Sequence, residues 1–139
     1  MGVTISSKRY SCDMGYAGFN RLRSTVAKQV SDEFYEHYML LSDPEVMRLT
    51  GIERKEFFKK YDAKTFEYIE ENKVTAEIYN FLYQPDCEGS VDRKQAKMIY
   101  NLIKNCDDDI IFGYVGREDC AKMADVKQIF SDKTKVKWI

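Results

Sequence analysis

Apolar residues recur every three or four positions from Phe19 to Leu41, and this spacing constrains the fold more than any other feature of the sequence. The residues between them that follow this spacing are Leu22, Val26, Val30, Phe34 and Tyr38. Steps of three and four place side chains on one face of an α-helix. The pattern predicts one long amphipathic helix that ends at Asp43, because Pro44 disfavours a helical conformation in the residue before it.

Shorter helices are predicted along the rest of the chain. Asp43 can cap a new helix that has Pro44 at its first position, and Gly51 is a natural stop for it. Apolar spacing predicts further helices over 52–61, from Asp62 over 66–69, over 75–83, from Ser90 or Asp92 over 98–103, and over 123–130. Glu118 and Asp119 favour the start of the last helix through its macrodipole.

Strands are predicted at both ends of the chain. Residues 3–6 alternate in polarity, and so do residues 133–138, which places Val136 and Trp138 inward and the lysines outward. Outward lysines are typical of exposed sheet edges. Residues 13–18 carry two glycines and are predicted to form a loop, whereas 110–112 fit either a short strand or an apolar loop anchor.

Length and composition favour one domain over 1–139. The chain has 139 residues, 44% of them hydrophobic and 32% charged, without a Pro/Gly/Ser-rich linker. The predicted fold class is therefore mostly α (α+β), with several amphipathic helices and a small sheet formed by the chain termini.

The overall charge is near zero. Lys and Arg number 22 and Asp and Glu 23, for a net charge of −1. A protein that grips nucleic acid normally shows a basic excess, and a nucleic-acid mimic an acidic one. We therefore do not expect direct nucleic-acid binding from the bulk charge, although a local basic patch stays open because net charge says nothing about distribution.

Cysteine usage and hydropathy predict a cytosolic protein without membrane association. No run approaches the roughly 18 apolar residues that cross a bilayer, and the first residues do not form a secretory signal. The four cysteines, at 12, 87, 106 and 120, include no Cys-x-x-Cys pair, so we expect reduced thiols.

Catalytic machinery is sparse. His37 is the single histidine, and no serine elbow, activated cysteine or glycine-rich phosphate loop accompanies it. We expect His37 to be a partly exposed helical residue, and the chain to be a non-enzyme that needs no cofactor.

Two acidic segments are weak metal-site candidates. Residues 84–95 resemble an EF-hand loop, with Asp86 and Glu88 at the third and fifth ligand positions, but Gln84 and Gln95 replace the carboxylates at its first and last positions. We favour the alternative interpretation, in which this segment is a glycine turn that caps the next helix. Asp107 and Asp109 belong to an acidic run that is either a metal site or a solvated cap.

Three stretches together carry a resemblance to a known group. They are Ser6-Ser7-Lys8 leading to Cys12-Asp13-Met14-Gly15-Tyr16-Ala17-Gly18-Phe19-Asn20-Arg21-Leu22-Arg23, then Tyr83 through Asp86-Cys87-Glu88-Gly89, and Asp107-Asp108-Asp109 through Gly113-Tyr114-Val115-Gly116-Arg117-Glu118-Asp119-Cys120-Ala121. The chain resembles small proteins carried by phages and prophages of Gram-positive bacteria, except that Ala17 stands where glycine is expected. The group has no established activity, so the resemblance implies an intracellular, phage-associated accessory protein and carries over no catalytic residue.

The leading functional hypothesis is a binding module. By analogy with other phage accessory proteins, it would bind a host protein or protein–nucleic acid complex in the bacterial cytosol and inhibit an antiviral defence complex. The candidate contacts lie on two glycine-bearing loops and the start of the long helix: Tyr16, Arg21, Arg23, Tyr114 and Arg117. An ordinary solvated helix face explains the basic residues of this set equally well.

Two other hypotheses stay open. One is a small-ligand, nucleotide or divalent-metal domain whose concave site gathers Asp107, Asp109, Arg117 and Glu118. The other is nucleic-acid binding through a local basic face. The sequence leaves the oligomeric state open.

Overall fold

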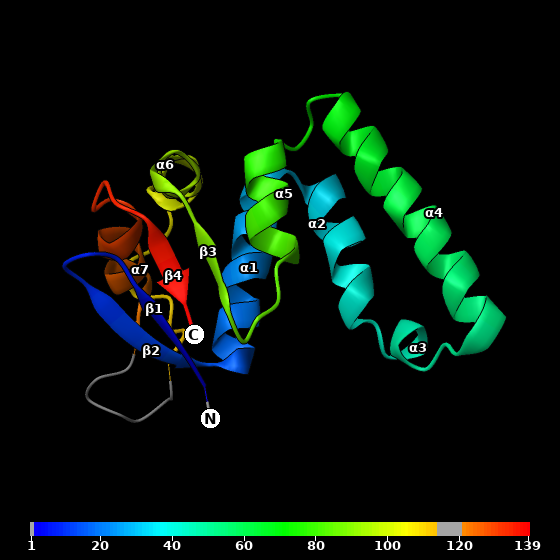
Figure 1. Cartoon of the computed structure of the whole chain (residues 1–139), viewed down its shortest axis with the longest axis horizontal. Coiled ribbons are helices and arrows are strands. Elements are labelled where there is room, and N and C mark those ends of the chain that lie inside the picture. The colour runs from blue at the N-terminus through cyan, green and yellow to red at the C-terminus, as the bar shows by residue number, and fades with distance from the viewer. Residues whose placement is uncertain (1, 114–120) are drawn as a thin grey trace.

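A four-stranded antiparallel sheet joins the two ends of the chain (Figure 1). The computed structural model describes residues 2–113 and 121–139. The strands are β1 (Gly2–Ser6), β2 (Ser11–Gly15), β3 (Gly89–Val91) and β4 (Val136–Trp138), in the order β2-β1-β4-β3. Ile5 pairs with Trp138, so the predicted pairing of the terminal strands is confirmed.

The sheet buries one face because its strands alternate in polarity. Val3, Ile5, Val136 and Trp138 are at most 1% exposed. Thr4 and Lys137 point to the other, open face. Because β4 pairs with strands on both sides, its lysine does not guard a sheet edge, and that part of the prediction is wrong.

The predicted long helix is two helices. α1 (Tyr16–Val30) ends before Ser31, whose extended backbone begins α2 (Asp32–Met39) and whose hydroxyl oxygen accepts a hydrogen bond from Phe34 N. This serine cap reorients the chain while the apolar spacing continues across the break. A short 3-10 helix, η1 (Leu40–Ser42), then leads to Asp43.

The next helices form an arm that stands at the outer edge of the molecule, beyond α2 (Figure 1). Asp43 caps α3 (Pro44–Met47), as predicted. α4 (Gly51–Glu70) follows, and Gly51 begins this helix with a φ of 58° and does not stop α3. α4 continues through Asp62, so the predicted helix start there is wrong.

Each of the remaining helices begins beside a side chain that caps it. Thr75 caps α5 (Ala76–Tyr83), and Asp92 with Gln95 forms a capping box for α6 (Arg93–Ile103). α7 (Met123–Phe130) is capped by Asp125, which accepts from the Lys122 backbone. Glu118 and Asp119 lie outside the described residues.

Two short segments differ from the prediction, and for a third the structure decides between the two alternatives. Residues 13–15 belong to β2, and Tyr16 begins α1, so no loop spans 13–18. β3 was not predicted, since three residues are too few for a periodic signal. Ile111 forms an isolated bridge with Lys122, which makes 110–112 a loop anchored by one bridge.

The core lies between the sheet and the helices, as expected for the α+β class. Its centre is aromatic: Phe19 lies 5.4 Å from Trp138 between ring centroids, and Phe81 packs edge-on against both rings. Of the described helices, none is long and apolar enough to cross a membrane.

Candidate functional site

The start of α1 contacts the loop that contains Ile111 and Phe112. A Cβ atom at Gly18 would clash with the carbonyl oxygen of Phe112, so only glycine permits this approach. Arg21 Nη1 donates to the carbonyl oxygen of Ile111 over 3.4 Å. The structure thus brings the two predicted glycine-bearing segments together.

Of the predicted contact residues on these segments, Tyr16 and Arg21 are exposed at the start of α1, Tyr16 by 37%. Tyr114 and Arg117 lie outside the described residues. Partner contact through Tyr16 and Arg21 therefore stays a prediction.

Arg23 is a core residue. It is 6% exposed, and its guanidinium carbon lies 4.5 Å from the ring centroid of Phe19 and 5.6 Å from that of Trp138. Its Nε and Nη2 have no hydrogen-bond partner among the residues that the structure describes. Burial lowers the pKa of Arg23. The prediction of Arg23 as a surface contact is wrong, because the helix turns this side chain under the sheet.

The EF-hand-like segment is a short strand followed by a capped helix. The Gln84 side chain bonds both the N–H and the carbonyl oxygen of Ser90, and the Gln95 side chain accepts from Asp92 N. Both glutamines are therefore committed to backbone groups. Asp86 and Glu88 are exposed on the connection between them.

The acidic run at 107–109 is also used locally. Asp107 accepts from the backbone N–H of Asp109, and Asp108 pairs with Lys127 at 2.6 Å. Within 2–113 and 121–139, no group of three or more His, Cys, Asp or Glu side chains is arranged to hold a metal ion. The weak metal candidates therefore gain no geometric support in this part of the chain.

His37 is buried, which corrects the prediction of a partly exposed residue. Its Nε2 lies 2.8 Å from the hydroxyl of Thr65, and its ring stacks on Tyr61 at 4.1 Å between centroids. Burial and the Lys64 cation lower its pKa. The Tyr61 and Tyr83 hydroxyls meet at 2.7 Å beside it. These side chains attach α4 to α2 and α5.

Cys12 and Cys106 are half-buried. Burial raises the pKa of Cys12 to about 12, and burial also raises the pKa of Cys106. Both therefore carry protonated thiols at neutral pH, a poor state for nucleophilic chemistry.

The outer face of α4 carries two exposed large apolar side chains that sequence reasoning missed. We give the name outer face to Ile52, Glu56, Lys59, Ala63 and Phe66, all exposed and spaced by three, four or seven residues along one helix. Ile52 is 75% exposed and Phe66 58%, and Met47 on the preceding α3 is 67% exposed. The sequence feature that could have identified this face is the apolar pattern of α4. It forms one stripe toward α2 and a second stripe on the opposite side of the helix.

Comparison of the chain with models of protein families, with curated proteins and with solved structures found no match.

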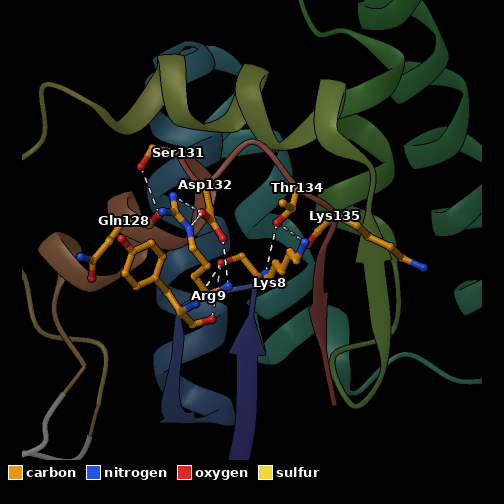
Figure 2. A network of polar contacts seen from close by, with 9 residues as sticks. Lys8, Arg9, Gln128, Ser131, Asp132, Thr134 and Lys135 are labelled. Carbon is orange, nitrogen blue, oxygen red and sulfur yellow. Dashed lines mark hydrogen bonds and ion pairs between the residues drawn. The ribbon is translucent and has the colours of Figure 1, made fainter.

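A polar network holds the C-terminal turn against the β1–β2 hairpin (Figure 2). Asp132 accepts from Arg9 Nε at 2.6 Å and from Arg9 N at 3.1 Å, and it pairs with Arg9 Nη2 at 2.6 Å. Lys8 N donates to Thr134 Oγ1 at 3.2 Å. Burial opposes ionisation of Asp132, but hydrogen bonds from Ser7 and Arg9 outweigh it and lower its pKa.

Proposed function

We propose that this protein acts by binding a host protein through the outer face of α4. The observation that carries the proposal is the exposure of Ile52 and Phe66 on a helix that stands apart from the sheet (Figure 1). Exposed large apolar side chains that share one helix face are typical of helices that bind a partner's groove.

The charges around this face indicate which charges a partner's binding site should carry. In 51–60 four basic residues outnumber two acidic ones, whereas in 61–70 three acidic residues outnumber one basic residue. A complementary site is a groove that is acidic beside the first half of α4 and basic beside the second half.

The resemblance to phage and prophage proteins supports the biological setting. We propose that the partner is a component of the host's antiviral defence in the bacterial cytosol, and that binding inhibits it. Small proteins inhibit larger complexes by covering a surface that the complex needs, which requires no catalytic group.

Capture from host lysate tests the proposal with three forms of the protein. The wild type and the apolar control Ile52→Leu/Phe66→Leu should retain the same host protein, whereas Ile52→Asp/Phe66→Asp should lose it. With that host protein purified, the Asp variant should bind at least tenfold more weakly, since buried apolar anchors carry much of an interface's affinity. Unchanged melting temperatures would show that all three forms fold.

Two results would contradict the proposal. One is equal capture by all three forms, which would place the contact elsewhere. The other is a concentration-dependent dimer that the Asp substitutions dissolve, which would make α4 a self-association surface.

A further inference from the structure

Two hollows flank the C-terminal turn at 131–135, and both are basic. One, of about 440 Å³, is lined by Ser6, Ser7, Lys8, Thr134, Lys135 and Lys137. The other, of about 420 Å³, has among its lining residues Arg93, Lys97, Tyr100, Asn101, Ser131 and Lys133. Among the described lining residues there are six cations and no carboxylate. We call Lys8, Arg93, Lys97, Lys133, Lys135 and Lys137 the turn surface.

The charge of the turn surface is uncompensated. In the described part of the chain, none of its six side chains takes part in an ion pair. Asp132, the carboxylate within the turn, has a side chain that is 0% exposed, and it is engaged by Arg9 (Figure 2). Arg9 and Asp132 neutralise one another. A local positive surface therefore exists on a chain whose net charge is −1.

The turn surface is held on a fixed frame. Lys133 has a φ of 62°, a left-handed conformation that is unfavourable for a residue with a Cβ. The Arg9–Asp132 contacts and the hydrogen bond from Lys8 N to Thr134 keep the turn in place despite that cost. Lys137 comes from the paired strand β4, and Arg93 and Lys97 lie four residues apart on α6. Cations on such a frame lose little freedom when an anion binds.

We propose that the turn surface binds the phosphate groups of a nucleic-acid backbone. Ammonium and guanidinium groups with hydroxyl and amide donors are the set that contacts phosphate oxygens in protein–nucleic acid complexes, and Ser6 and Asn101 supply the neutral donors. Hollows on both sides of one turn suit a ligand that repeats its negative charge along a chain. Contacts to phosphates alone give binding that depends on salt and little on sequence.

One observation favours nucleic acid over a lipid surface. None of the lining residues is an exposed large apolar side chain that would insert between lipids. The inference is also independent of the proposed function, because the turn and the α4 arm lie at opposite sides of the molecule (Figure 1).

Fluorescence anisotropy with a labelled single strand of 20 nucleotides and a duplex of 20 base pairs tests the inference at 50 mM and 200 mM salt. The turn variant is Lys8→Ala/Lys135→Ala/Lys137→Ala. The matched control is Lys55→Ala/Lys60→Ala/Lys64→Ala on α4, which removes the same charge from three exposed lysines outside the defined outer face.

The wild type and the α4 control should bind at least one of the two nucleic acids at 50 mM salt. The turn variant should bind at least tenfold more weakly, and its plot of log affinity against log salt should be shallower by about 2, since each lost phosphate contact removes somewhat less than one unit. No binding at low salt, or an equal loss in both variants, would overturn the inference. Displacement of the probe by polyglutamate or by phosphatidylserine vesicles as effectively as by unlabelled DNA would also overturn it.

Discussion

The imidazole of His37 lies stacked on the phenol ring of Tyr61, with 4.1 Å between the ring centroids. The Thr65 hydroxyl donates its single proton to the Tyr61 carbonyl oxygen at 3.0 Å, so it accepts from His37 Nε2–H at 2.8 Å. Phe34 and Tyr68 add a second ring contact between α2 and α4. The position of the α4 arm therefore depends on a small aromatic contact around one neutral histidine.

Substitution of His37 tests this attachment. We expect His37→Ala to lower the free energy of unfolding by about 3 kcal/mol, because it removes a buried ring and a hydrogen bond. His37→Phe keeps the ring and should cost only about 1 kcal/mol. Urea denaturation of the three forms gives these values, and equal losses for both variants would show that stacking contributes little.

The same histidine makes stability depend on pH. Because burial and Lys64 lower the pKa of His37 in the folded protein, the unfolded chain binds its proton more readily. Stability should therefore fall as the pH drops below about 6.5, by at most about 1.4 kcal/mol per pH unit from this group. The difference between wild type and His37→Phe, measured from pH 7.5 to 5, isolates the effect. A difference that is constant over this range would contradict the prediction.

Asp132→Asn tests the polar network that holds the C-terminal turn. The pKa of Asp132 is lowered in the folded protein, so its contribution is present above the unfolded value near 4 and is lost as the pH falls through the lower folded value. The variant should melt below the wild type at pH 7, and the gap should close in acid. Asp62→Asn, at an exposed position on α4, is the matched control and should leave the melting temperature unchanged.

Gly18 and Gly51 should respond differently to alanine. Gly18→Ala brings a Cβ against the carbonyl oxygen of Phe112 and should cost more than about 2 kcal/mol, despite the better helix propensity of alanine. Gly51→Ala meets open space and should cost only about 1 kcal/mol for its positive φ. Thermal denaturation ranks the pair, and the reverse ranking would mean that the approach of α1 to residues 111–113 is looser than described.

Arg23→Met should leave the protein at least as stable as the wild type. The substitution removes two buried N–H donors that have no partner among the described residues, and methionine can pack on Phe19 and Trp138 in place of the guanidinium. Denaturant unfolding measures the outcome. A loss above about 1 kcal/mol would show that the contacts of the guanidinium with the aromatic rings outweigh its desolvation.

Much of the fold follows from local sequence signals, namely capping residues and the alternation of polarity. Asp43, Thr75 and Asp92 begin helices as their chemistry predicts, and the alternation around Val136 and Trp138 identifies a strand. The break at Ser31 was missed because apolar spacing persists through it, so periodicity alone reports a single helix. Asp62 was predicted to start a helix because aspartate is a good capping residue. Aspartate also fits on an exposed helix face, and Asp62 lies within α4.

The candidate surfaces were less predictable, because each depends on contacts distant in sequence. Arg23 was expected on the surface, and only the position of Trp138, more than a hundred residues later, shows that it is covered. The turn surface joins Lys8, Arg93 and Lys133 from three parts of the chain, so no linear window contains it. The outer face of α4 was recognisable within one segment of sequence, because Ile52 and Phe66 lie on the side of the helix opposite the residues that pack toward α2.

Site-specific photo-crosslinking in host cells tests most directly whether the outer face of α4 is the contact surface. A photoreactive residue in place of Ala63 lies on that face, and one in place of Gln29, exposed on α1, serves as the control. Our account predicts a covalent adduct with one host protein from position 63 and none from position 29. The same adducts from both positions, or an adduct only with a second copy of the chain, would contradict it.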